Sequence, residues 1–465
     1  MKKNILKKVT AYALTACLCC SVITGCGNVD ESTSKTGKES TSTTQSPTGD
    51  NNNTNNTDNE PKVAYPGVIY SATGSDFKRL SSEEIWDINI EEKVLTNYDK
   101  FVINSSLATF TKSENYLFSP MSLYLALCLC EGISEPEVTE DLLNLLGYDT
   151  LDELEESAAV LMKVLSCDED GKISAVANSI WIDDRIDLSD DAKQVLENAA
   201  LTMLADIYQS DLVSEDTKNA INSWISDQTD GMITEMPIEP NEETAMTLFN
   251  TLLFDKSWED IIEDEAVYAE EFTCPDGTKM SVDMIHHTVE NNPYVKAASS
   301  TASAMYYADG SYMIFIKPDA GKSLEDVMNG DLETVISAYR NYNFTGSWNN
   351  EVRFKFPVLD YETDVPELEN VVAGMGVSSI FDNGAFPAFG DQICVSAIAQ
   401  KCHIIVDKNG TKAAAVTQIS LKDTAMPDDE EPEIIKMDMT SEYAYVIMSA
   451  GNIPLFVGSV VTPEA

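Results

Sequence analysis

Residues Asp407 to Pro432 read DKNGTKAAAVTQISLKDTAMPDDEEP and contain no helix cap, no apolar stripe at helical spacing and no tight turn that closes a strand pair. A connection this long inside a compact domain is uncommon and is usually functional or disordered. In its first half every second residue is small or apolar: Thr411, Ala413, Ala415, Thr417, Ile419 and Leu421. A period of two is typical of a strand with one face in a core. The pattern predicts a loop that is able to become a strand; an edge strand followed by an acidic surface loop is the alternative.

The N-terminus carries a targeting signal over residues 1–25. Four lysines precede an apolar run, Val9 to Ile23, which is too short for a comfortable membrane span. The run ends at Ile23-Thr24-Gly25-Cys26, which resembles the lipobox of bacterial lipoproteins. That resemblance implies cleavage before Cys26 and a lipid on its thiol; an ordinary signal peptide with a chance cysteine is the alternative. We expect an exported protein, anchored by lipid to the outer face of the cell membrane or released.

Residues 26–87 are expected to be a linker, and residues 88–465 a folded domain. From Gly27 to about Pro61 the composition is Ser, Thr, Asn and Asp, which buries too little apolar surface to become ordered. Residues 62–87 are transitional, with scattered apolar groups. No second linker or repeat follows, so the remainder is predicted to be one domain.

Charge and cysteine spacing exclude several classes of function. The chain has 30 Lys and Arg against 78 Asp and Glu, a net charge of −48, so no basic patch exists to neutralise nucleic-acid phosphates. The same charge would repel an anionic membrane, which leaves the lipid as the only anchor. No CxxC spacing occurs after Cys26, so neither a metal nor another cofactor is predicted.

The coarse secondary structure is mixed. Helical spacing marks residues 94–110, 119–130, 152–167 and 217–228, and Ser119-Pro120 provides an N-cap and a first-turn proline. Strand-like runs cover residues 174–182, 247–254, 312–317, 352–359, 393–406, 443–448 and 455–460. Because helices dominate the first part and strands the last, the predicted class is α+β.

Six motifs in order resemble the serpin family. They are Asn115 to Ser122 (NYLFSPMS), Ala177 to Trp181 (ANSIW), Ile221 to Trp224 with Thr229 to Ile233 (INSW, TDGMI), Leu248 to Trp258 (LFNTLLFDKSW), Val395-Ser396 with Gly410 to Ala415 (GTKAAA), and Pro454 to Gly458 (PLFVG). The resemblance extends from about Glu91 to Pro463. It implies three β-sheets, eight to nine helices and an exposed reactive-centre loop.

The resemblance also implies a function. In that family the loop is bait for a serine protease, which forms an acyl-enzyme; the cut loop then inserts into the main sheet as a strand and distorts the protease. We therefore expect a monomer whose partner is an extracellular serine protease in a covalent complex. A serpin-fold binding or adhesion protein that no longer traps proteases is the alternative.

By the same resemblance the hinge comprises Gly410, Thr411, Lys412, Ala413, Ala414, Ala415 and Val416, and counting from Gly410 places the bait bond at Thr424–Ala425. A small residue there suits an elastase-like or subtilisin-like enzyme. Shifted registers leave three alternative reactive residues, Leu421, Lys422 and Met426. Lys408 and Lys412 stand where the family usually has acids, and Gln400 replaces a common His; the two lysines put inhibitory efficiency in doubt.

An enzyme is not predicted. The chain has three histidines, and no G-x-S-x-G, Walker or H-E-x-x-H pattern. His286 and His287 could be a metal pair, but adjacent residues on a strand face opposite ways, which favours a surface role. His403 lies in an apolar strand region, which favours a structural role.

Overall fold

The computed structural model describes residues 65–71, 88, 90–131, 133–165, 168–169, 172–173, 176–236, 239–346, 349–365, 367–390, 393–395, 398, 400–411 and 431–463. By its contacts the chain divides after residue 64, and the architecture below is that of the unit from Tyr65 onward. This unit therefore begins inside the predicted linker 26–87. The reason is a short strand, β1 (Val68–Tyr70), which pairs with β6 (Ala205–Ser210).

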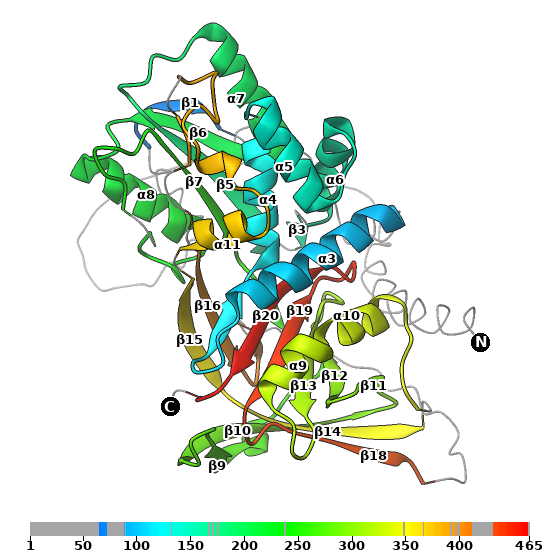
Figure 1. Ribbon diagram of the computed structural model, residues 1–465. Coiled ribbons are helices and arrows are strands. Elements are labelled where there is room, and N and C mark those ends of the chain that lie inside the picture. Colours follow the sequence, from blue (N-terminus) through cyan, green and yellow to red (C-terminus); the bar gives the residue numbers. More distant parts are fainter. Residues whose placement is uncertain are drawn as a thin grey trace, which may run out of the picture. The chain divides into compact units, whose positions relative to one another are not determined.

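The main sheet is present as two four-stranded halves (Figure 1). One half has the order β1-β6-β5-β7, with β5 (Val176–Asp183) parallel to β6 and antiparallel to β7 (Met246–Leu252). The other half has the order β15-β16-β17-β8, from Leu359–Val365, Gln400–Asp407, Gly410–Thr411 and Lys256–Ser257. Only residues 253–255 separate β7 from β8, so one chain segment runs through both halves.

Two further sheets complete the β-structure. A six-stranded sheet has the order β11 (Tyr294–Lys296), β12 (Ser300–Tyr306), β13 (Tyr312–Pro318), β19 (Tyr443–Met448), β20 (Pro454–Val460) and β2 (Tyr116–Phe118). Another has the order β18 (Glu433–Asp438), β14 (Asn350–Pro357), β10 (Lys279–Glu290) and β9 (Val267–Thr273). A small hairpin, β3 (Asp168–Glu169) with β4 (Lys172–Ile173), stands apart.

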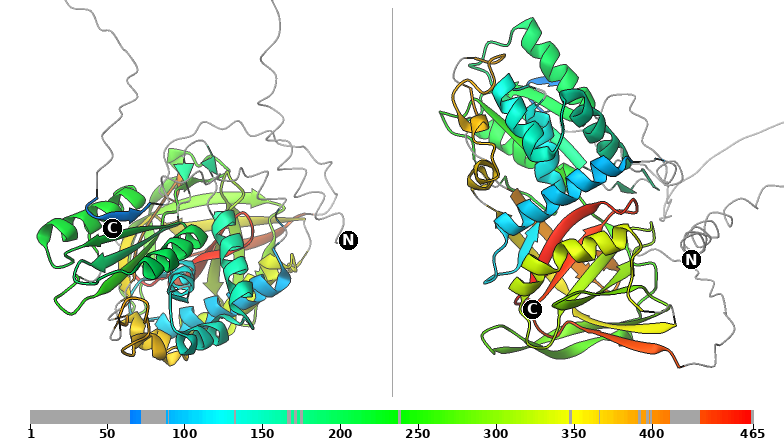
Figure 2. Two further views of the ribbon diagram at one scale, coloured as in Figure 1. Left: turned by 90° about the horizontal axis from the view of Figure 1, so that it is seen from above. Right: turned by 45° about the vertical axis from the view of Figure 1, so that its right-hand side comes forward.

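The described residues form nine α-helices. They are α3 (Glu92–Thr109), α4 (Pro120–Glu131), α5 (Pro136–Leu146), α6 (Leu151–Leu165), α7 (Asp190–Met203), α8 (Glu215–Gln228), α9 (Leu324–Gly330), α10 (Leu332–Arg340) and α11 (Leu368–Gly374), with short 3-10 turns at Asp264–Ala266 and Ser379–Phe381. Helix α4 is apolar nearly all round and is buried on every side, as expected of a core helix. Helices α3, α9 and α10 lie along the six-stranded sheet (Figures 1 and 2).

Side-chain caps fix where the helices begin. The Ser119 hydroxyl accepts a hydrogen bond from the backbone N–H of Ser122, with Pro120 as the first helical residue of α4. Ser189 and Ser214 cap α7 and α8 in the same way. Each of these last two caps is followed by two acids, which stabilise the positive end of the helix dipole.

Helix α8 packs on one face of the main sheet through a separate apolar cluster (Figure 1). Trp181 of β5 and Tyr208 of β6 stack at 4.1 Å, and Trp224 of α8 lies against them. Tyr65 adds an edge contact to both stacked rings, and its hydroxyl donates to Asp227 Oδ2 on α8 at 2.6 Å. The N-terminal segment thus ties β6 and α8 together.

The predicted α+β class is confirmed, and the nine described helices agree with the expected eight or nine. The main sheet taken as one, the six-stranded sheet and the β9–β10–β14–β18 sheet correspond to the three sheets expected. The largest boundary difference is in the strand expected over residues 393–406, which begins only at Gln400; residues 393–395 have no regular structure. The strand expected over residues 352–359 ends at Pro357, and Leu359 begins β15.

Candidate functional site

The two ends of the predicted loop lie in different sheets. Its leading end is β17, Gly410–Thr411, in the main sheet, and its trailing end is β18, which pairs in parallel with β14. Residues 412–430 lie outside the described residues. The predicted bond Thr424–Ala425, the alternatives Leu421, Lys422 and Met426, and the hinge residues from Lys412 to Val416 therefore all fall on residues that the structure does not describe.

Strand β17 lies between β16 and β8 and is antiparallel to both. Thr411 pairs with Val406 of β16 and with Lys256 of β8, and Gly410 pairs with Asp407 and with Ser257. The predicted hinge therefore starts as a two-residue strand inside the main sheet. A chain continuing beyond Thr411 in the same direction would run between β16 and β7.

A cavity of about 80 Å³ lies along that path. Its lining includes Leu248, Asn250 and Leu252 of β7, Cys402 and His403 of β16, and Thr411 at one end. No ladder pair joins β7 to β16 in the described part of the chain. Because neighbouring strands stand about 4.8 Å apart, a cavity this small admits a strand only if the two halves of the sheet move apart.

Aromatic residues hold the leading end in place. The ring of Trp258 stacks on Tyr307 at 4.4 Å, and its indole N–H donates to the Asp407 carbonyl oxygen at 2.9 Å. The Tyr307 hydroxyl lies 2.6 Å from Thr411 Oγ1, and both side chains are buried. Burial raises the pKa of Tyr307 well above its ordinary value, so this hydroxyl keeps its proton.

Gly410 is required by close packing. Its φ is 151°, and a Cβ at this position would lie 2.1 Å from the carbonyl oxygen of Lys256. Real Cβ atoms do not come so close to a backbone oxygen, so β8 and β17 could not keep this register with any other residue.

Lys408, which lies just before the hinge, has an acidic partner. Lys408 Nζ lies 2.6 Å from Asp264 Oδ1, and Lys256 Nζ lies 3.0 Å from Asp309 Oδ2 close by. The hydrogen bond from Lys408 to Asp264 raises the pKa of Lys408. Lys408 is thus paired across the surface and does not point into the path of the loop.

At the far end of the cavity Gln400 joins β16 to the start of α4. Its Oε1 accepts from the Ser119 N–H at 2.7 Å and its Nε2 donates to the Ser119 carbonyl oxygen at 3.0 Å. The Ser119 hydroxyl donates to the carbonyl oxygen of Leu455 at 3.0 Å. Gln400 therefore fulfils a structural role between the main sheet, α4 and β20. Next to it, burial raises the pKa of the Cys402 thiol to about 12, which keeps that cavity wall uncharged.

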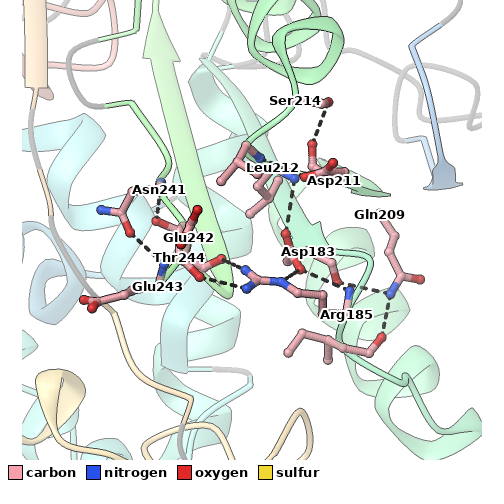
Figure 3. A network of polar contacts seen from close by, with 12 residues as sticks. Asp183, Arg185, Gln209, Asp211, Leu212, Ser214, Asn241, Glu242, Glu243 and Thr244 are labelled. Atoms are coloured by element: carbon pink, nitrogen blue, oxygen red, sulfur yellow. Dashed lines mark hydrogen bonds and ion pairs between the residues drawn. The ribbon is translucent and has the colours of Figure 1, made fainter.

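A polar network lies at the start of β7, the end of that strand away from β8 (Figure 3). Arg185 forms an ion pair with the buried Asp183 and donates to the carbonyl oxygens of Glu242 at 2.8 Å and Thr244 at 3.3 Å. Asp183 Oδ2 accepts from the Leu212 N–H at 3.2 Å. Burial acts to raise the pKa of Asp183, but the hydrogen bonds from Arg185 and Leu212 outweigh it, and the pKa is lowered. The network joins β5, the segment before α8 and the segment before β7.

The two adjacent histidines do not form one site. His286 stacks on Tyr268 at 4.2 Å and its Nε2 lies 3.2 Å from Glu270 Oε1, whereas His287 Nε2 lies 3.1 Å from Asp260 Oδ2. No cluster of His, Cys, Asp or Glu that could hold a metal ion occurs among the described residues. The described cysteines Cys128, Cys130, Cys274, Cys394 and Cys402 are free thiols.

The main sheet has two halves that no ladder pair joins between β7 and β16 in the described residues, and β17 is the start of a strand that leads between them. These are features that the sequence motifs imply. The chain belongs to the serpin family: the model of that family, described as serpin (serine protease inhibitor), matches residues 100–463.

Relatives with known descriptions agree with this assignment. Serpin-ZX of Arabidopsis thaliana is 26% identical over 401 residues, which cover 81% of this chain and 98% of the relative. Alpha-1-antitrypsin 1-1 of Mus musculus is 24% identical over 388 residues, covering 80% of this chain and 89% of the relative. The solved structure of the thermophilic serpin tengpin in its native state superposes with a TM-score of 0.71 at 24% identity, covering 85% of this chain and 100% of tengpin. The latent state of tengpin gives a TM-score of 0.67 and covers 81% of this chain and 100% of that one.

Two features of the site were missed from sequence. The first is the N-terminal strand β1 with Tyr65, although the consecutive β-branched and aromatic residues Val68, Ile69 and Tyr70 are a signal that could have indicated it. The second is the pair of contacts made by His403, which join segments distant in sequence and leave no local pattern.

Proposed function

We propose that this serpin inhibits an extracellular serine protease as a suicide substrate. The observation that carries the proposal is β17: its two residues are already paired on both sides, and the cavity continues from them between β7 and β16. After the protease cuts the loop and becomes acylated, the leading segment would extend β17 as a full strand and carry the bound protease with it. Loop insertion into a sheet is a known way of releasing stored strain.

The strand pairing of β17 supports the proposal that the small side chains of the loop would face the core. If the antiparallel pairing 411↔406 continues along β16, Ala413 comes opposite Ile404 and Ala415 opposite Cys402, which are both buried. The row Thr411, Ala413, Ala415 and Thr417 would then face the core, as Thr411 already does. Small uncharged side chains suit this row, because an unpaired buried charge would cost several kcal/mol.

The same count supports Thr424–Ala425 as the bait bond. On the β7 side the pairing 411↔256 places residue 421 opposite Met246, where β7 begins, and Thr424 opposite Glu243. Insertion up to Thr424 would therefore use the whole length of β7. It would move the acylated residue to the end of the sheet where Arg185 binds the segment before β7 (Figure 3). We propose an elastase-like or subtilisin-like target, with Leu421, Lys422 and Met426 as the other positions to examine.

We further propose that the mature chain is a monomer that is exported and lipidated at Cys26, on a tether that holds the inhibitor away from the membrane. The support is the residue pattern before Cys26 and the polar composition that follows it. Within the described ranges, none of the helices combines the length and apolarity needed to cross a bilayer. Mass spectrometry of the N-terminal peptide from cell envelopes tests the lipid: an unmodified Cys26 thiol would refute it.

The inhibitory proposal is tested by incubation with elastase, subtilisin and trypsin. We expect a covalent complex that survives denaturing electrophoresis, and mass spectrometry of the released C-terminal fragment to begin at Ala425. The cleaved chain should also melt at a much higher temperature than the intact chain. Cleavage without a complex, together with an unchanged melting temperature, would overturn the proposal and favour a binding or adhesion protein on the same fold.

Two matched variants separate insertion from cleavage. Ala415→Glu places a charge in the row that would face Cys402 and should abolish complex formation while cleavage continues. Gln418→Glu adds the same charge to the opposite row and should keep the complex. Equal complex formation by the two variants would show that the loop does not insert in this register.

A further inference from the structure

The space between β7 and β16, where no ladder pair joins the two strands in the described residues, is called the strand vacancy below. His403 connects its two sides on the face that carries α8. Its Nδ1 lies 3.1 Å from the carbonyl oxygen of Met232, in the segment between α8 and β7, and its Nε2 lies 2.8 Å from Asp360 Oδ1 on β15. The side chain is 16% exposed, and both His403 and Met232 line the cavity. His403 is therefore a bridge from β16 to a segment that belongs with the other half of the sheet.

Both partners of the ring can only accept hydrogen bonds. A backbone carbonyl oxygen carries no proton, and an ionised carboxylate is likewise an acceptor only. Two contacts at 2.8 and 3.1 Å are therefore both satisfied only when each ring nitrogen bears a proton, so that the ring is an imidazolium. In either neutral tautomer one nitrogen would present its lone pair to an oxygen, and one of the two contacts would become repulsive.

Charged groups from three segments of the chain surround the ring. On β15, Asp360 makes the contact described and Glu362 Oε1 lies 3.7 Å from Nδ1. On β16, Lys401 is neutralised by Glu362, whose Oε2 lies 3.0 Å from Lys401 Nζ. The segment after α8 contributes Glu235, whose charge acts on Lys401. Among the described groups named here, the acidic side chains outnumber the one lysine.

The bridge lies across the route of the proposed inserting strand. Continuing the pairing 411↔406 by three residues on each strand brings Ala414 opposite His403. A strand at that position would increase the distance between β16 and β7 by about 4.8 Å. The Met232 segment precedes β7 in the chain, and if it moves with β7 during that separation its 3.1 Å contact with His403 is lost.

We propose that His403 is a proton-dependent latch on the strand vacancy: the imidazolium holds the Met232 segment to β16 and slows entry of the loop. Loss of the Nδ1 proton, with the Nε2–H kept on the Asp360 carboxylate, releases the Met232 contact and accelerates entry. This proposal rests on the proposed loop insertion. It makes the inhibitor slower to commit in mildly acidic surroundings and faster at neutral to alkaline pH. Histidine is suited to this role because it changes charge between about pH 5 and 8.

The first test reads the ring itself and does not depend on inhibition. With only three histidines in the chain, the protein labelled with ¹⁵N-histidine gives few ring signals, and His403→Gln assigns them. We expect both nitrogens of His403 to be protonated at about pH 6. A neutral His403 ring under that condition would overturn the latch, whatever the protein does to proteases.

The second test measures the rate of loop insertion after cleavage, by intrinsic fluorescence, across about pH 5 to 8. We expect His403→Gln, which cannot carry the charge, to insert roughly tenfold faster than the wild type at the acidic end and at a similar rate at the alkaline end. His286→Gln, on β10, is the matched control and should retain the wild-type profile. Comparing the variants with the wild type at the same pH removes the effect of pH on the protease itself.

The outcomes distinguish the two proposals. Parallel pH profiles for wild type and His403→Gln, with insertion intact, would overturn the latch alone. A cleaved loop that never inserts at any pH would overturn the proposed function, and the ring-protonation measurement would still test the geometry of His403. A change in pH profile in His286→Gln equal to that in His403→Gln would also overturn the latch, because the effect would not be specific to the vacancy.

Discussion

The hydroxyl of Tyr307 and the hydroxyl of Thr411 lie 2.6 Å apart in a fully buried position, and this bond joins the last described residue of the hinge to the residue that follows β12. Trp258 stacks on the ring of Tyr307 and donates its indole N–H to the backbone carbonyl oxygen of Asp407. The entry point of the proposed insertion path is thus held by specific polar contacts within an aromatic cluster.

We expect Tyr307→Phe and Thr411→Val each to lower the free energy of unfolding by about 1–2 kcal/mol, because each leaves one buried hydroxyl without its partner. The double variant should lose about 1 kcal/mol less than the sum, since no hydroxyl remains unsatisfied. Urea unfolding of the four proteins measures the coupling. Strictly additive losses would mean that the two hydroxyls do not interact.

Gly410→Ala should lower the free energy of unfolding by more than about 2 kcal/mol, because the added methyl group would meet the Lys256 carbonyl oxygen. Gly277→Ala is the matched control: Gly277 has φ of 84° but open space around a Cβ, so only backbone strain of about 1 kcal/mol is expected. Hydrogen exchange at the amides of β8 and β17 would locate the damage. Equal losses in both variants would exclude the close approach as the cause.

Asp183→Asn should cost about 2 kcal/mol at pH 7, because a buried charge-assisted network loses its acceptor. The pKa of Asp183 is lowered in the folded state from the ordinary 3.8. Its contribution is therefore fully present above that ordinary value and is lost as the pH falls through the folded-state pKa. The difference from wild type in urea unfolding should shrink towards about pH 3. The exposed neighbour Asp184→Asn should change stability by less than about 0.5 kcal/mol; a loss that does not depend on pH would contradict the role of the charge.

Glu131→Gln should stabilise the protein at alkaline pH. Burial raises the pKa of Glu131 to about 7, and its Oε1 has no hydrogen-bond partner within the described part of the chain. Because the unfolded chain releases this proton near the ordinary value of 4.5, wild-type stability falls as the pH rises from there to about 7 and is then constant. We expect a gain of about 2 kcal/mol for the variant at pH 8 and little at pH 4, with exposed Glu156→Gln neutral at both. A gain that is the same at both values would point to packing in place of ionisation.

Local sequence patterns predicted much of the fold. The Ser119-Pro120 cap and the start of α4 follow from residue types alone. These features depend on neighbours in sequence, where capping and periodicity act.

Other features depend on contacts that no local pattern records. Arg185 binds carbonyl oxygens 57 and 59 residues further along the chain, and backbone acceptors have no sequence signature. His403 was expected to be structural because it lies in an apolar strand. In β16 it lies between the buried residues Cys402 and Ile404 and faces the other side of the sheet, and its contact with Met232 depends on how α8 crosses the sheet. The length of β16 was overestimated because apolar residues 393–395 pack without pairing as a strand.

The separate attachment of the two loop ends has a consequence for the product of proteolysis. Everything after a cut between 412 and 430 includes β18, β19 and β20, and β19 and β20 are buried along their whole length in the six-stranded sheet. The severed C-terminal peptide therefore stays with the body without a covalent link, so the nicked molecule would elute as a single particle and come apart only in denaturant. A protease esterified to the leading half would be carried off while the trailing half stayed where it was, and the two new chain ends could no longer meet to be rejoined.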